Sequence, residues 1–246
     1  CGCLGICLSV LVDPLQLIMS SQPRLLMMLP YVPYPVDRGT YQRVFHLAEI
    51  LGSQFQLDLF CLDQEGREEE ARPVLEKFCH RFQAVPFEHP PWPALFPDRL
   101  LDSRPTTVRH WQSDSVSEAL EAFRGNETYD LVHFCDLVLW PYMEAAFPGH
   151  PRLILDRSRV DWLFQTEELQ HLQLGFKDRL LRRENLAKIA RMEKQVYAKV
   201  ALEVVCGQDD RAFLQEKLGD ASRIYVLPNG YNHRFFDENS FPPRPR

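Results

Sequence analysis

Several signatures of common enzyme classes are missing from this sequence of 246 residues. Neither G-x-G-x-x-G nor G-x4-G-K-[ST] occurs, which disfavours NAD-type dinucleotide binding and hydrolysis of nucleotides by a P-loop. The sequence also has no G-x-S-x-G elbow, and its residue spacing shows no Ser-His-Asp or Cys-His arrangement. Hydrolysis through a covalent nucleophile is therefore disfavoured.

An excess of positive charge is missing as well. The chain has 28 Lys and Arg against 34 Asp and Glu, a formal net charge of −6, and a pI near 5.8. Because binding to nucleic-acid phosphates needs a basic surface, we expect no nucleic-acid partner. A hydrophobic fraction of 45% and a charged fraction of 25% are typical of globular proteins and exclude disorder, coiled coil and collagen.

No apolar run is long enough to cross a bilayer. The uncharged stretch at the start, residues 1–12, lacks the basic region of a signal peptide. Met19 precedes a polar stretch and then an apolar run, so we expect translation to start there. Residues 1–18 would then be an extension outside the fold.

The chain has seven cysteines, an odd number. Four of them lie in apolar segments, as buried thiols usually do, which indicates a reducing compartment. The other three, Cys1, Cys3 and Cys7, form C-x-C-x3-C, which matches no zinc-binding spacing. We therefore expect no metal site there.

Short apolar runs alternate with amphipathic helical patterns from Arg24 onward. This alternation predicts an α/β fold in which helices cover both faces of a mostly parallel sheet. Ligands bind such sheets beyond the carboxyl ends of the strands, so the loops that follow strands are the candidate sites. The expected strands are residues 25–29, 55–62, 82–85, 131–134, 153–155, 203–206 and 224–227, and the expected helices are residues 38–51, 68–79, 115–123, 178–200 and 209–218.

Two segments leave alternatives open. Residues 86–105 contain six of the 19 prolines, which predicts a long loop without regular structure before Thr106. This loop either packs on the surface or forms a flap over an acceptor or a membrane surface. Residues 177–199 hold eight Lys and Arg against three Asp and Glu and predict a basic amphipathic helix. Its apolar stripe either faces the core or contacts anionic lipid, and consists of Leu186, Ile189, Met192, Val196 and Val200.

Polar residues suited to a substrate follow three of the expected strands. Gly39 opens a helix, where backbone amides and the helix dipole favour a phosphate, although the glycine could simply make a turn. His133 lies near the end of its strand with Asp136 behind it, and either faces a substrate or is a satisfied core histidine. Beyond the next strand come Asp156, Arg157 and Arg159.

Four segments carry a family resemblance. They are residues 33–47 (PYPVDRGTYQRVFHL), residues 129–133 (YDLVH), Asp156 with the Arg-rich helix that reaches Glu193, and residues 226–236 (VLPNGYNHRFF). In this order they resemble the N-terminal domain of GT-B glycosyltransferases of the family 4 type, particularly sugar transferases of bacterial exopolysaccharide systems. The resemblance implies a Rossmann-like acceptor-side domain over residues 19–236, followed by the start of a linker at residues 237–246 and a donor domain beyond the sequence.

The resemblance also implies residue roles. The Gly39 and Thr40 amides would contact the donor phosphate, Arg43 would neutralise charge near it, and His133 would face the transferred sugar as the catalytic residue. Asp156, Asn229 and Gly230 would complete the substrate-binding set. Many relatives have a second glycine where Thr40 stands, which bears on how closely the phosphate approaches.

The function implied is transfer of a sugar from a nucleotide-sugar to a glycan or a lipid-linked acceptor, with retention of configuration and without a metal or another cofactor. The expected location is the cytoplasm, with peripheral contact at the inner face of the plasma membrane. Because the donor domain with its paired glutamates is not in the sequence, we expect the chain alone to be inactive. Two alternatives stay open: a non-catalytic glycan- or protein-binding module, and another Rossmann-type enzyme such as an epimerase or reductase.

Overall fold

The computed structural model describes residues 22–91, 99 and 101–230. The expected extension at residues 1–18, with its three cysteines, and the expected linker at residues 237–246 lie outside this part. So do most of the aromatic residues of the proline-rich loop.

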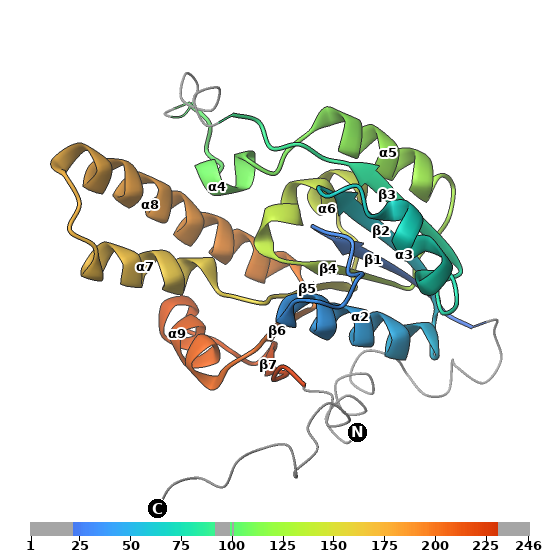
Figure 1. Cartoon of the computed structure of the whole chain (residues 1–246). Coiled ribbons are helices and arrows are strands. Elements are labelled where there is room, and N and C mark those ends of the chain that lie inside the picture. The colour runs from blue at the N-terminus through green and yellow to red at the C-terminus, as the bar shows by residue number, and fades with distance from the viewer. Residues whose placement is uncertain (1–21, 92–98, 100, 231–246) are drawn as a thin grey trace, which may run out of the picture.

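Seven parallel strands form one sheet in the order β3-β2-β1-β4-β5-β6-β7 (Figure 1). This arrangement confirms the predicted α/β fold class. The strand order reverses beside β1, which pairs with both β2 and β4. The strands are β1 (Arg24–Leu29), β2 (Gln56–Asp63), β3 (Arg81–Pro86), β4 (Leu131–Cys135), β5 (Leu153–Asp156), β6 (Leu202–Val205) and β7 (Ile224–Val226).

Helices cover both faces of the sheet (Figure 1). Alternate residues of β1 face opposite sides: Met27 packs with α2 and α3, whereas Met28 packs with α5, α6 and the second half of α8. These two faces form the hydrophobic core, and a third cluster lies among α7, α8 and α9. The helices are α2 (Gly39–Gly52), α3 (Glu68–Leu75), α4 (Thr106–Arg109), α5 (Asp114–Arg124), η2 (Leu137–Leu139), α6 (Trp140–Ala146), α7 (Asp161–His171), α8 (Phe176–Lys199) and α9 (Gln208–Leu218).

Four helical elements were not predicted, namely α4, η2, α6 and α7. Three of them have seven residues or fewer, and such short elements carry little periodic signal. The fourth, α7, buries only Trp162 and therefore shows no apolar stripe. The prediction that α3 reaches Cys79 was wrong: the helix ends at Leu75, and tighter turns follow it. The prediction of no regular structure before Thr106 holds for the described residues, since α4 begins there.

The basic helix α8 resolves one alternative. Ile189, Met192, Val196 and Val200 are at most 7% exposed, so the second half of its apolar stripe belongs to the core. The first half of α8 has no such burial and extends with α7 away from the sheet (Figure 1).

A buried ion cluster ties α8 to the sheet. The Arg157 guanidinium, 1% exposed, contacts Glu193 Oε1 at 2.8 Å and Oε2 at 2.5 Å, and its Nε lies 2.9 Å from Glu203 Oε1. We call these three residues the Arg157 cluster. Burial raises the pKa of Glu203 to about 6, and the Arg157 charge only partly opposes this shift. One cation therefore serves two buried carboxyls, and Glu203 is the less well compensated.

This imbalance makes stability depend on pH. A carboxyl whose pKa is raised by folding stabilises the fold fully below its unfolded pKa, and this contribution is lost as pH rises through about 6. Glu203→Gln should abolish a loss of about 2 kcal/mol between pH 4.5 and 7.5, as measured by urea unfolding. The matched control is Glu216→Gln, which changes a side chain that is 70% exposed. If both variants keep the same pH dependence as the parent protein, Glu203 is not its source.

Candidate functional site

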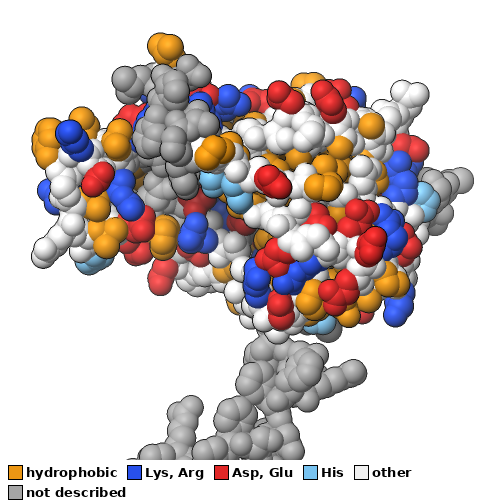
Figure 2. All heavy atoms as spheres, turned by 45° about the horizontal axis from the view of Figure 1, so that its top comes forward, with side chains coloured by type: hydrophobic (Ala, Val, Ile, Leu, Met, Phe, Trp, Pro, Cys, Tyr) orange, Lys and Arg blue, Asp and Glu red, His pale blue; other side chains and the backbone are white. Residues whose placement is uncertain are grey.

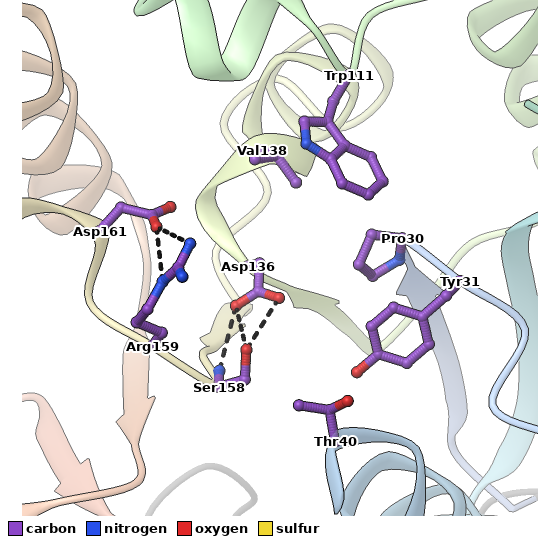
Figure 3. A pocket seen from close by; sticks show the side chains of 9 residues that line it. All are labelled: Pro30, Tyr31, Thr40, Trp111, Asp136, Val138, Ser158, Arg159 and Asp161. Carbon is purple, nitrogen blue, oxygen red and sulfur yellow. Dashed lines mark hydrogen bonds and ion pairs between the residues drawn. The ribbon is translucent and has the colours of Figure 1, made fainter. Parts of the chain in front are cut away.

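A cavity of about 410 Å³ opens at the carboxyl ends of β1, β4 and β5, where the strand order reverses (Figure 3). This edge is where ligands bind in open parallel sheets. We call this cavity the strand-end pocket. Its lining residues are Pro30, Tyr31, Thr40, Trp111, Asp136, Val138, Ser158, Arg159 and Asp161.

Asp136 occupies a strained position in this pocket. It follows the last residue of β4 with φ 69° and ψ 150°, a region almost restricted to glycine. A side chain held there costs about 1–3 kcal/mol. Its amide donates to the Asp156 carbonyl at 2.8 Å, and its carboxylate accepts from the Ser158 amide and hydroxyl at 3.2 Å each. These contacts fix the carboxyl group against Ser158 (Figure 3).

The surroundings of Asp136 favour its neutral form more than water does. Burial raises its pKa to about 6, the Asp161 carboxylate adds to the shift, and the Ser158 amide opposes it. Asp161 in turn pairs with Arg159, whose Nη2 lies 2.9 Å away. A carboxyl with such a pKa is mostly ionised at neutral pH and accepts a proton readily, as a group that contacts a substrate hydroxyl should.

Aromatic and hydroxyl groups complete the pocket. Trp111 and Tyr31 stand on the side opposite Arg159 and Asp161, with the Tyr31 hydroxyl directed toward Thr40 (Figure 3). Burial raises the pKa of Tyr31, so this phenol keeps its proton and can donate a hydrogen bond. Ring faces, hydroxyl groups and the carboxylates of Asp136 and Asp161 around a cavity suit a small polyhydroxylated ligand.

A second polar cluster lies between the sheet and α2, next to the pocket. Arg43 Nη2 donates to Asp156 Oδ1 at 2.8 Å, and Arg43 Nη1 donates to the Leu227 carbonyl at 2.6 Å and to Asn229 Oδ1 at 3.3 Å. The His133 Nε2 atom lies 3.5 Å from Asp156 Oδ2. We call Arg43, His133, Asp156 and Asn229 the Arg43 cluster. It brings together four of the seven predicted site residues.

Asp156 holds its charge in this cluster. Burial alone would raise the pKa of Asp156, but the His133 ring and the Arg43 guanidinium outweigh it and keep this pKa below its usual value. Because Arg43 directs both of its η nitrogens to protein acceptors, it links α2 to the ends of β5 and β7. The cluster supports the pocket floor, since the Asp156 carbonyl accepts from the Asp136 amide.

Of the three remaining predicted residues, Thr40 lines the strand-end pocket, whereas Gly39 and Gly230 belong to neither place. His133 is 5% exposed and does not line the strand-end pocket, whereas Thr40 does. Gly39 is the exposed first residue of α2, and a Cβ atom placed there would meet nothing within 4 Å. Gly230 is exposed and equally open.

His133, Cys135 and Asp156 have a donor set that suits zinc, with ligand atoms within 4.8 Å of one another. The charge environment opposes such a site. Arg43 already donates to Asp156, and a second cation there would be repelled. Burial also raises the pKa of the Cys135 thiol well above its usual value, which disfavours the thiolate that a metal requires. The Arg43 cluster is therefore better suited to its guanidinium than to a metal ion.

Some residues of the pocket have a signal in the sequence. Asp136 and Arg159 were recognised as polar residues after strands, but neither was assigned to the site. Their spacing from the strand ends was the available signal. Trp111 had none, because it follows the short helix α4 rather than a strand and reaches the pocket only through tertiary packing.

No known family model matches the sequence, and no curated protein matches it. Two similar solved structures are those of Phytolacca americana UGT2 with UDP-2fluoro-glucose and pterostilbene and of the glycotransferase of kitacinnamycin. The first is 17% identical to this chain with a TM-score of 0.47, and the match covers 87% of this chain and 55% of that protein's chain. The second is 12% identical to this chain with a TM-score of 0.45, and the match covers 92% of this chain and 56% of that protein's chain. The chain thus spans about half the length of these proteins, and similarity this low assigns no family. Among the described residues, no helix combines the length and apolarity needed to cross a membrane.

Removing the Arg43 guanidinium should be costly. In Arg43→Met the Asp156 carboxylate, 3% exposed, loses its cation, and we expect a loss of about 3–5 kcal/mol in the free energy of unfolding. The control is Arg38→Met, since Arg38 is 52% exposed and pairs with Glu65 at the surface. That variant should lose less than about 1 kcal/mol. Equal losses in urea unfolding would contradict the supporting role of the Arg43 cluster.

Proposed function

We propose that this chain is the acceptor-binding half of a glycosyltransferase that moves a sugar from a nucleotide-sugar to a glycan or lipid-linked acceptor. The observation that carries the proposal is the strand-end pocket. In it the Asp136 carboxylate accepts from the Ser158 hydroxyl, and Trp111 lines the same cavity (Figure 3). A sugar offers hydroxyl donors to the carboxylate and an apolar ring face to the indole. The sequence motifs described above support the same function.

In this proposal, Asp136 binds the attacking hydroxyl of the acceptor. The hydroxyl donates a hydrogen bond to the carboxylate, which is fixed by Ser158 and therefore orients one lone pair of the hydroxyl toward the donor sugar. With retention, as the resemblance implies, the departing phosphate takes the proton and Asp136 only orients the acceptor. An inverted product would instead identify Asp136 as the general base.

The donor would lie beside the amino end of α2. Its phosphates would meet the first amides of this helix, at Gly39 and Thr40, and no metal is needed where a helix dipole stabilises the leaving diphosphate. Arg43, Asp156 and Asn229 bind one another, so we assign them a positioning role behind this surface. The catalytic role of His133 stays a prediction from the resemblance, and so does the substrate-contacting role of Gly230.

The cellular setting belongs to the same proposal. Nucleotide-sugars would reach the protein in the cytoplasm, and a lipid-linked acceptor would bring it to the inner face of the plasma membrane as a peripheral protein.

A non-catalytic glycan-binding module is the second candidate. It is favoured by one observation: the strand-end pocket presents an indole, hydroxyl groups and the fixed Asp136 carboxylate, which are groups that bind a sugar without any reaction. Both candidates predict glycan binding, and only the first predicts transfer once a donor-binding half is present.

The 246-residue chain alone should transfer no sugar, because a GT-B enzyme needs two facing domains to stabilise the leaving diphosphate. The measurement is product formation from a panel of nucleotide-sugars and oligosaccharides, followed by mass spectrometry. The buffer without protein sets the background. Turnover above that background by the chain itself would show that this chain is not merely the acceptor-binding half of the enzyme.

Glycan binding should depend on Asp136. We expect Asp136→Asn to weaken binding roughly 10- to 100-fold, since a hydrogen bond to a charged group is lost. Asp136→Gly should weaken it similarly while stabilising the fold, because glycine relieves the strain at φ 69°. In the parent protein, affinity should rise as pH increases through about 6 and the carboxyl ionises.

Saturation-transfer NMR with neutral mono- and disaccharides, combined with urea unfolding, provides both readouts. The control is Glu121→Gln, an exposed position on α5. Unchanged binding in both Asp136 variants would remove this residue from the acceptor site. Destabilisation by the glycine variant would mean that the backbone strain is not relieved.

A further inference from the structure

Exposed hydrophobic side chains are concentrated at one end of the described structure. Seven large hydrophobic residues of the described structure are exposed, and six of them are Leu101 or belong to α7, α8 and the turn between them. The most exposed are Leu101 at 87%, Phe176 at 83% and Leu180 at 58%. The others of this end are Phe164, Leu172 and Leu181, whereas Ile50 lies apart on α2.

These side chains form a surface and are not scattered singly. Phe176 and Leu180 are four residues apart on α8 and therefore share one side of the helix. The segment that carries Leu101 runs beside the same turns, because Arg99 binds the Leu181 carbonyl. We call Leu101, Leu172, Phe176, Leu180 and Leu181 the apolar tip. Exposed apolar surface of this kind marks a place of contact with another molecule or with a membrane.

Basic side chains surround the apolar tip. Residues 172–183 contain Lys177, Arg179, Arg182 and Arg183 but only one acidic residue, Asp178. Arg182 pairs with Glu168 at 2.7 Å, whereas Lys177, Arg179 and Arg183 make no ion pair with any described residue. Figure 2 shows blue and orange side chains together at this end of the molecule, on the left. Three unpaired cations therefore flank the exposed apolar residues.

We propose that the apolar tip docks on the surface of an anionic lipid bilayer. Apolar side chains inserted at the headgroup boundary, with Lys and Arg beside the phosphates, are the arrangement that such a surface selects. A second copy of this chain is a poorer occupant, because it would bring the same three cations to the interface. The whole chain carries a net charge of −6, so its average charge opposes anionic lipid, whereas the cations beside the tip favour it.

The position of the tip fits an acceptor presented at a membrane. Helix α7 begins at Asp161, which lines the strand-end pocket, so the α7 and α8 pair rises from the rim of that pocket. The 11 residues of α7 span about 16 Å, which sets the distance from the rim to the turn. Docking does not require sugar transfer, and it can fail or succeed independently of the function proposed above.

Vesicle co-sedimentation of the 246-residue chain tests the proposal. Vesicles of phosphatidylcholine with 30% phosphatidylglycerol should bind the protein at low salt, and pure phosphatidylcholine vesicles should bind it at least tenfold more weakly. Phe176→Ser with Leu180→Ser should reduce binding to the mixed vesicles at least tenfold. Replacing Lys177, Arg179 and Arg183 by Gln should reduce it roughly hundredfold, at about fivefold for each charge, and should remove most of its salt dependence.

Ile50→Ser is the matched control, because it removes an apolar side chain that is 43% exposed on α2. It should bind like the parent protein, and circular dichroism should show that all variants keep the fold. Absence of binding to the mixed vesicles, or equal loss in the control, overturns the proposal. Sedimentation velocity adds a third arm: a dimer that Phe176→Ser dissociates would assign the tip to a second copy instead.

Discussion

The parallel direction of all seven strands is the constraint on which the rest of the structure depends. Parallel neighbours need crossover connections, so helices must cover both faces and every carboxyl end must emerge at one edge. Residues far apart in sequence, such as Tyr31, Asp136 and Ser158, meet there only for this reason. The strand-end pocket is thus a product of topology first and of side-chain chemistry second.

Ion pairs clamp the end of β5 from both faces of the sheet. Consecutive side chains of a strand point to opposite faces, so Asp156 meets Arg43 beneath α2 while Arg157 meets Glu193 of α8. Buried pairs of this kind contribute little net stability but penalise any arrangement that separates them. The result is a rigid end of β5, and Ser158, which holds the Asp136 carboxylate, extends from it.

The sequence predicted most of the sheet and the edge at which the pocket opens. Buried runs such as residues 25–29 are unambiguous because both faces of a parallel strand are apolar. Short or mostly polar helices such as α6 and α7 were not predicted, since they leave little periodic signal in the sequence. Among the predicted site residues, Arg43, His133, Asp156 and Asn229 lie together in the Arg43 cluster.

The burial and mutual pairing of the Arg43 cluster could not be predicted from the sequence. A motif shows which residues occur, but it does not show which acceptors surround them. The pocket itself was harder still to foresee. The strain at Asp136 comes from a positive φ angle that an aspartate in the sequence does not indicate. Trp111 reaches the cavity through packing alone.

Helix α8 has a mechanical consequence. Its 24 residues form a rod of about 36 Å, with one end at the exposed turn and the other in the core. The inner half is held at Glu193 by Arg157, and the outer half packs against α7 away from the sheet (Figure 1). Any tilt of α8 against the sheet would have to separate the buried Arg157 and Glu193 pair, so this pair sets the angle at which α8 leaves the sheet.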